Sequence, residues 1–133
     1  KKQEHHIYVF AIVNEEYALI IEDKTNTSEH GNQLKRYSEW VKGKEQYSEL
    51  DLHCIYYKTG NESYAKLKRL EENYTKEYPE ENFAIITRED VLSVLKQSTT
   101  TNAIFCDYVE HLQKIQDLTD SYLSSPLYVA STV

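Results

Sequence analysis

The chain has 133 residues, a length typical of one domain, and 40% of them are hydrophobic, which is enough to bury a core. Its net charge of −7 argues against the large basic surface of a non-specific nucleic-acid binder. Cys54 and Cys106 lack metal-ligand spacing, so we expect no structural zinc site and two buried free thiols in a reducing compartment. The absence of a signal peptide and of a membrane-length apolar run predicts a cytoplasmic protein without membrane contact.

Two apolar segments near the N-terminus, residues 7–13 and 17–24, predict a pair of antiparallel strands. The second contains the run Tyr-Ala-Leu-Ile-Ile without Gly or Pro, so we expect it to be buried on both faces. Because side chains alternate along a strand, Glu22 and Lys24 should share one face and Asp23 should lie on the other. An acid and an amine at the end of a buried strand are costly to desolvate unless they are paired or bind a ligand.

The next two elements predict a crossover. Residues 32–42 predict a helix that ends before Gly43, and Gln33 and Tyr37 lie one turn apart on it. Residues 51–58 predict a third strand. The order strand, helix, strand predicts that the third strand runs parallel to the second.

The second half of the chain predicts one more strand among helices. Residues 62–77 are helix-prone, and residues 83–86 predict a short fourth strand. A helix should start after Thr87, with Asp90 completing a capping box, and the threonines at 99–101 should cap the last helix. Apolar residues at helical spacing, which we expect to be buried, are Tyr64, Leu67, Leu70 and Tyr74 in the first of these helices and Ile104, Phe105, Tyr108, Val109, Leu112, Ile115 and Leu118 in the last.

Together these elements predict an α/β fold, with a small mixed β-sheet of β-β-α-β order flanked by helices, in a single domain over residues 1–133. Within it, residues 21–25 (Ile-Glu-Asp-Lys-Thr) and 32–37 (Asn-Gln-Leu-Lys-Arg-Tyr) combine an ExK strand with a QxxxY helix. This pair resembles the PD-(D/E)xK nuclease superfamily, in its branch with a QxxxY element. The resemblance extends over the order of elements to about residue 97, and it implies a restriction-endonuclease-like fold.

The resemblance implies metal-dependent hydrolysis of phosphodiester bonds in nucleic acid, with DNA preferred over RNA, in restriction, repair or phage defence. Mg²⁺, or Mn²⁺ in its place, would bind the carboxylate of Glu22 and the backbone carbonyl of Asp23. Lys24 would orient the attacking water or stabilise charge on the phosphate. Gln33 and Tyr37 would reach the same site or the DNA backbone.

Basic residues gather locally in spite of the negative total. Residues 24–44 carry five basic side chains against two acidic ones. Among them, Lys35 and Arg36 would contact phosphates of the nucleic acid.

The family pattern also has an Asp on its first strand, and this chain has none there. His6 and Tyr8 have the strand parity that faces Glu22, and His6 is the favoured metal ligand because it precedes an unbroken apolar run. A neutral His binds transition metals better than Mg²⁺, and Glu4 is an acid that could substitute. Family members usually have a helix before the hairpin, whereas six polar residues precede it here, so we expect a fragment, a partnered subunit or a homo-oligomer.

Three alternatives stay open from the residues alone. Glu22 and Lys24 can form a plain salt bridge, with Gln33 and Tyr37 as ordinary helix residues. The incomplete set of acids favours a catalytically degenerate nuclease fold that acts as a binding or assembly module. The acidic segment 71–81 would suit an α/β domain that binds a protein partner and no nucleic acid.

Overall fold

A computed structural model of the chain describes residues 9–24 and 33–125. They form two compact units, which divide between Ile86 and Thr87. The single domain expected over residues 1–133 stays a prediction. Within the described ranges, no helix combines the length and the apolar character that crossing a membrane requires.

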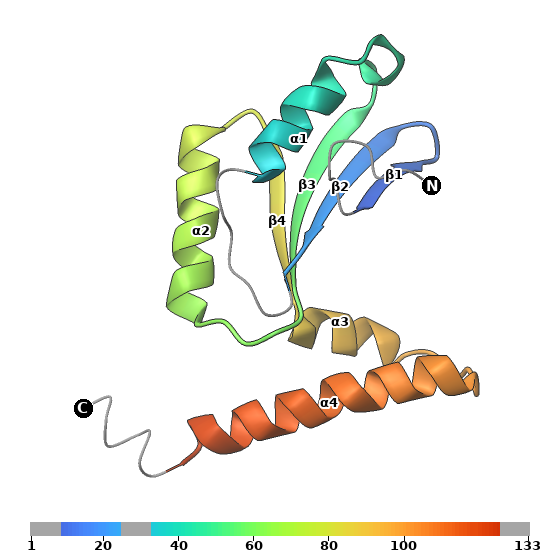
Figure 1. Cartoon of the computed structure of the whole chain (residues 1–133), viewed down its shortest axis with the longest axis vertical. Coiled ribbons are helices and arrows are strands. Elements are labelled where there is room, and N and C mark those ends of the chain that lie inside the picture. The colour runs from blue at the N-terminus through green and yellow to red at the C-terminus, as the bar shows by residue number, and fades with distance from the viewer. Residues whose placement is uncertain (1–8, 25–32, 126–133) are drawn as a thin grey trace. The chain divides into compact units, whose positions relative to one another are not determined.

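The first unit is built on a sheet with the strand order β1-β2-β3-β4 (Figure 1). Its strands are β1 (Val9–Val13), β2 (Tyr17–Asp23), β3 (Asp51–Lys58) and β4 (Asn82–Thr87). β1 and β2 are antiparallel, and β2 and β3 are parallel. The mixed α/β sheet and its predicted strand directions are therefore confirmed.

A tight turn joins the first two strands. Asn14 and Glu15 have positive φ angles of 54° and 57°. Residues 14–16 form the loop, in which the backbone N–H of Glu16 donates to the carbonyl of Val13 at 3.1 Å. Two consecutive residues with positive φ suit the right-handed twist of the strands on either side. This turn fixes the register in which Val13 lies opposite Tyr17 and Val9 lies opposite Ile21.

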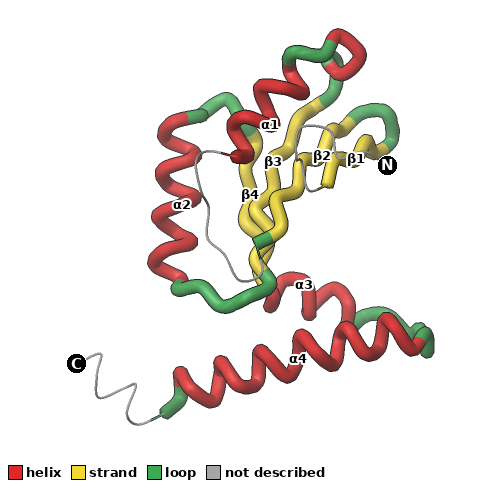
Figure 2. The backbone as a smooth tube through the Cα atoms, in the orientation of Figure 1, coloured by secondary structure: helices red, strands yellow, loops and turns green. Residues whose placement is uncertain are grey.

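Two helices pack on one face of the sheet, α1 (Gln33–Lys42) and α2 (Tyr64–Glu77) (Figure 2). A short 3₁₀ turn, η1 (Glu45–Tyr47), follows α1 and leads to β3. The hydrophobic core lies between this face and the two helices. Its buried members are Ala18, Ile20, Leu34, Tyr37, Val41, Cys54, Tyr56 and Tyr74.

Burial along β2 corrects one expectation. Ala18, Ile20 and Glu22 are buried, whereas the residues between them are only partly buried. The strand is thus fully buried on one face and not on both, because α1 and α2 pack against the same side of the sheet. The alternation still places Glu22 and Lys24 on the buried side and Asp23 on the other, as expected.

The second unit consists of α3 (Arg88–Leu95) and α4 (Ala103–Leu123). The predicted capping box is confirmed, since the side chains of Thr87 and Asp90 each accept a backbone hydrogen bond at the start of α3. The cap of α4 is Asn102 and not one of the predicted threonines. Asn102 stands directly before the first helical residue, where its side-chain oxygen can accept from the first turn.

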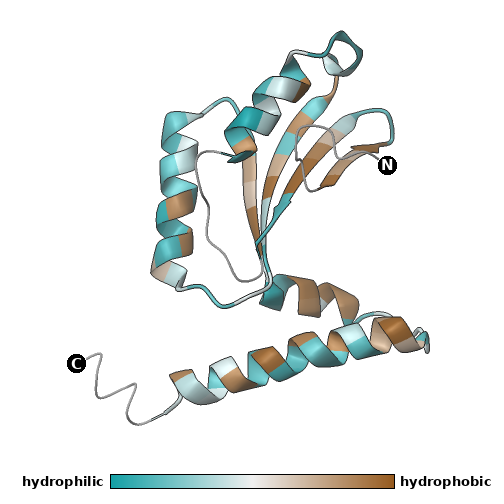
Figure 3. Ribbon diagram, in the orientation of Figure 1, coloured by the Kyte–Doolittle hydropathy of each residue, from teal (hydrophilic) through white to brown (hydrophobic). Residues whose placement is uncertain are grey.

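Several side chains expected in the core are exposed. Tyr64 is 79% exposed, Ile104 82% and Leu118 74%. Cys106 is also exposed, whereas Cys54 is buried as expected, and both are free thiols. Figure 3 shows hydrophobic and hydrophilic residues interleaved along α4. Helical spacing identifies an apolar stripe on a helix, but it does not show how much of that stripe a neighbouring element covers.

Candidate functional site

The C-terminal end of β2 carries two buried charged side chains. Glu22 is 5% exposed and Lys24 is 8% exposed. The amine Nζ of Lys24 lies 2.7 Å from Oε1 of Glu22. The backbone N–H of Lys24 donates to the carbonyl of Tyr57 at 2.8 Å, which holds the end of β2 against β3. The predicted charges therefore form a buried ion pair, whose desolvation cost requires further polar partners.

Helix α1 supplies one such partner to the same amine. Nζ of Lys24 donates to Oε1 of Gln33 at 2.6 Å. This contact ties the end of β2 to the first residue of α1. An ammonium has three N–H donors, and Glu22 and Gln33 accept from two of those of Lys24.

Tyr37 lies one turn further along α1 and is 4% exposed. Burial raises the pKa of Tyr37, and the negative charge of Glu22 raises it further, while nearby cations and a hydrogen bond with Gln33 oppose the rise. Tyr37 is therefore a neutral phenol within the electrostatic reach of Glu22. The structure thus brings Glu22, Lys24, Gln33 and Tyr37 together, as the resemblance implies, and their catalytic roles stay predictions.

The second oxygen of Glu22 is the unusual atom of this cluster. Oε2 is buried and has no hydrogen-bond partner among the described residues. An unsatisfied buried carboxylate oxygen is costly, and in native proteins it points to a water or an ion. Mg²⁺ binds one or two carboxylates and completes its shell with waters and substrate phosphate. The orphan oxygen of Glu22 therefore fits a divalent cation.

The other predicted ligands are less defined. His6 and Tyr8 lie outside the described residues. Asp23 is partly exposed, on the face opposite Glu22, and its backbone carbonyl stays a predicted ligand. Within residues 9–24 and 33–125, no group of three His, Cys, Asp or Glu side chains is arranged to hold a metal.

The two predicted phosphate-binding residues of α1 differ in their surroundings. Nζ of Lys35 lies 3.1 Å from Oε1 of Glu81 and 4.1 Å from the ring centre of Tyr78. A phosphate at Lys35 would have to compete with that ion pair. Arg36 is exposed. A nucleic-acid contact by either residue stays a prediction.

Lys58, the last residue of β3, was missed by the sequence reasoning. It is only 3% exposed, and the parallel register that sets Tyr56 opposite Glu22 puts it on the buried face of the sheet. Burial lowers the pKa of Lys58, Glu62 opposes this, and the charge of Lys24 lowers it further. The available signal was alternation, because Lys58 has the same parity on its strand as the buried Tyr56.

The family model described as the PD-(D/E)XK nuclease superfamily matches residues 2–124. No curated protein and no solved structure matches the chain. The matched residues include the whole cluster at the end of β2 and the start of α1, and the mixed sheet with its helices is consistent with a restriction-endonuclease-like fold. The chain belongs to the PD-(D/E)XK nuclease superfamily.

Proposed function

We propose that the chain hydrolyses phosphodiester bonds of nucleic acid in a metal-dependent reaction centred on Glu22 and Lys24. The observation that carries the proposal is that the two carboxylate oxygens of Glu22 have different surroundings. One of its oxygens receives the amine of Lys24, and the other is buried without a partner among the described residues. A plain salt bridge would satisfy the carboxylate more fully, because an orphan oxygen adds cost without adding stability.

A divalent cation, when bound at Oε2 of Glu22, would polarise the phosphate and lower the pKa of a bound water. The reaction is attack of a water oxygen on phosphorus, with breakage of the bond to the leaving oxygen, which takes up a proton. Lys24 holds a positive charge in place for this step, because Glu22 and Gln33 fix its amine from two sides. A non-bridging phosphate oxygen would accept a hydrogen bond from the third N–H of the Lys24 amine.

Gln33 and Tyr37 are positioning residues in this proposal. Gln33 accepts from Lys24 and so fixes the direction of the amine. Tyr37 closes the buried side of the cluster with a neutral phenol. Both stand on α1, whose packing on the sheet sets their distance from the end of β2.

The substrate we propose is DNA, which the superfamily resemblance implies, with restriction, repair or phage defence as the setting and Mg²⁺ or Mn²⁺ as the metal. We place the activity in the cytoplasm. Cys54 and Cys106 are both free thiols, which is the usual state of cysteines in a reducing compartment.

The direct test is cleavage by the full chain. Supercoiled plasmid and circular single-stranded DNA are incubated with the protein in Mg²⁺, in Mn²⁺ and in EDTA, and nicked and linear products are measured on gels. We expect cleavage in at least one metal and none in EDTA. Failure to cleave either DNA in either metal would contradict the proposal.

A wild-type chain without activity would favour the second candidate, a degenerate nuclease fold that acts as a binding module. The same assay on Tyr8→Asp and His6→Asp then distinguishes an incomplete site from a fold with another role. Tyr8→Asp is the first variant to make, because the described pairing of β1 with β2 ends at Val9 opposite Ile21, next to Glu22. Cleavage gained by either variant would show that one acid completes the site.

A further inference from the structure

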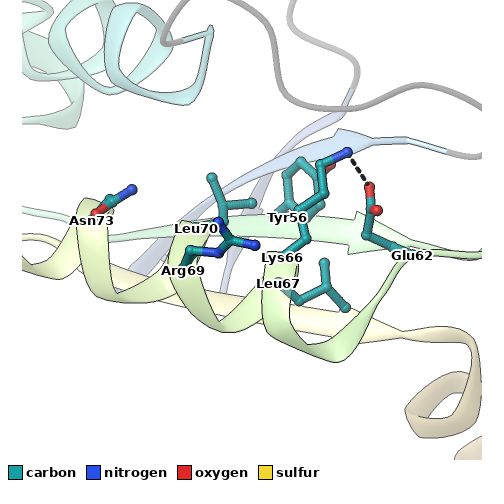
Figure 4. A pocket seen from close by; sticks show the side chains of 7 residues that line it. All are labelled: Tyr56, Glu62, Lys66, Leu67, Arg69, Leu70 and Asn73. Carbon is teal, nitrogen blue, oxygen red and sulfur yellow. Dashed lines mark ion pairs between the residues drawn. The ribbon is translucent and has the colours of Figure 1, made fainter. Parts of the chain in front are cut away.

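A hollow of about 480 Å³ lies between α2 and the C-terminal half of β3 (Figure 4). Its volume is in the range of pockets that hold a small organic ligand. β3 contributes one residue, and α2 with the residues just before it contributes the others. The lining residues are Tyr56, Glu62, Lys66, Leu67, Arg69, Leu70 and Asn73.

The hollow adjoins the candidate catalytic cluster through β3. Tyr56, which lines the hollow, lies opposite Glu22 in the parallel ladder, and both are buried. Lys58 follows two residues later on the same strand, is buried, and interacts electrostatically with the cations Lys24 and Lys66 as well as with the acids Glu62 and Asp23. Strand β3 therefore runs from the candidate catalytic cluster to the hollow.

Two cations of α2 line the hollow. Lys66 and Arg69, three residues apart, line the hollow, whereas the acidic residues Glu71 and Glu72 do not. Glu62 pairs with Lys66 at 3.2 Å and is largely covered, while the side chain of Lys66 is 54% exposed. With Glu62 counted, the lining carries two cations and one acid, a net positive charge in a chain with a total of −7, which favours an anionic ligand there.

The floor and the wall differ in chemistry. Leu67 and Leu70 are partly buried and offer apolar surface beside the ring of Tyr56. The Nε–H of Arg69 donates to the carbonyl of Ala65 at 3.4 Å, which holds its side chain along the helix. An apolar floor below a cationic rim suits a nucleotide, whose base is flat and apolar on its faces and whose phosphate is charged.

We propose that this hollow is a subsite for one unpaired nucleotide next to the scissile phosphate, with Lys66 and Arg69 as its phosphate-binding residues. The inference rests on the proposed function and adds the substrate class, a single strand. A space of about 480 Å³ between a helix and a sheet can receive one nucleotide, but a base pair with both backbones is much larger. Single-strand binders commonly combine a positive groove with surfaces on which bases pack.

The test is binding in EDTA, where hydrolysis does not occur, measured by fluorescence anisotropy. The probes are labelled oligothymidine and a duplex of the same length. Lys66→Ala and Arg69→Ala are compared with wild type and with Lys68→Ala, an exposed lysine of the same helix that pairs with Glu72 and does not line the hollow. Thermal melting confirms that each variant is folded.

We expect tighter binding of the single strand than of the duplex. Lys66→Ala and Arg69→Ala should each lower single-strand affinity about tenfold, the effect of losing one charged hydrogen bond. Each should also reduce the slope of log affinity against log salt by about 0.7, one phosphate contact on a single strand. Arg69→Lys should recover part of the loss, and Lys68→Ala should stay within about twofold of wild type.

The outcomes separate this inference from the proposed function. Equal binding by Lys66→Ala, Arg69→Ala and Lys68→Ala would overturn the subsite while leaving metal-dependent cleavage intact. Duplex binding as tight as single-strand binding would overturn the strand preference. Specific binding without cleavage in any metal would uphold the subsite and contradict the nuclease. No binding to any probe at low salt would overturn the subsite, while the cleavage assay with metal decides the proposed function.

Discussion

Glu22→Gln is expected to lower the rate of metal-dependent cleavage by about 1000-fold, because loss of one preorganised charge at a reacting centre costs about 10²–10³ or more. The substitution keeps the shape of the side chain and a carbonyl oxygen that can accept from Lys24. It removes the negative charge and the second carboxylate oxygen, Oε2, which is buried without a partner among the described residues. The chain should therefore stay folded while its activity is lost.

The measurement is the initial rate of plasmid nicking, with a melting curve for each variant. Glu39→Gln is the matched control, since Glu39 is an exposed acid on α1 whose side chain is 63% accessible. Lys24→Ala is the second active-site variant, because it removes the amine that Glu22 and Gln33 hold. Activity that persists in both active-site variants would show that the reaction takes place elsewhere.

The second large effect is on stability, at Glu81. This carboxylate follows α2, and its side chain is only 4% exposed. It accepts hydrogen bonds from Lys42 at 2.9 Å, Lys35 at 3.1 Å, Ser38 at 3.1 Å and Tyr74 at 2.7 Å. Glu81 thereby joins α1 to α2. Glu81→Ala should lower the free energy of unfolding by about 3–5 kcal/mol, because it leaves partly buried donors without their acceptor.

The pH dependence of stability provides a separate readout for Glu81. Burial acts to raise its pKa, but hydrogen bonds from Lys42, Tyr74 and Lys35 prevail and lower the pKa from 4.5 to about 2. A depressed carboxyl pKa adds stability that is fully present above pH 4.5 and is lost as the pH falls through about 2. At about 1.4 kcal/mol per pKa unit, the contribution is about 3 kcal/mol.

Urea unfolding between pH 7 and pH 2 measures both quantities. Glu81→Gln should remove this part of the acid-induced loss, so its curve should be flatter than that of wild type. Glu80→Ala, at the exposed neighbouring position, should change the free energy of unfolding by less than about 0.5 kcal/mol. Parallel pH curves for wild type and Glu81→Gln would contradict the role assigned to this carboxylate.

The burial and the partners of Glu81 could not be predicted from the sequence. Its position in the acidic segment 71–81 suggested a surface for a protein partner. Its partners Lys35 and Lys42 stand about 40 positions earlier in the chain, and no local pattern links them to it. Only the packing of α1 beside α2 makes one acid of the segment a buried acceptor.

The four strands and the relative directions of the first three were predictable for a local reason. Apolar β-formers separated by polar turns mark β1, β2 and β3, and a single helix between two strands predicts the parallel pair. The boundaries of β3 agree with the prediction in full, whereas the burial of Ile104 and Leu118 was wrong. Periodicity describes one helix, while burial depends on what other elements cover.

The candidate site was likewise predictable only in part. The spacing of ExK and QxxxY identified the four side chains that meet at the end of β2. The spacing brings the two motifs into contact, because the amine of Lys24 donates to Gln33 at 2.6 Å. Identifying Lys58 as a neighbour of the cluster also required the register of β3 against β2. Alternation along β3 shows which face Lys58 shares only after the two parallel strands are aligned. The orphan oxygen of Glu22 could not be inferred from residue types at all.

The central claim is that Oε2 of Glu22 is a metal ligand, and calorimetric titration with Mn²⁺ tests it most directly. We expect one ion per chain with a Kd below about 1 mM in wild type and in Glu39→Gln. Glu22→Gln should weaken this binding at least about tenfold, as loss of a metal-site group generally does. Equal affinity of wild type and Glu22→Gln for Mn²⁺, or no binding by wild type, would contradict the claim.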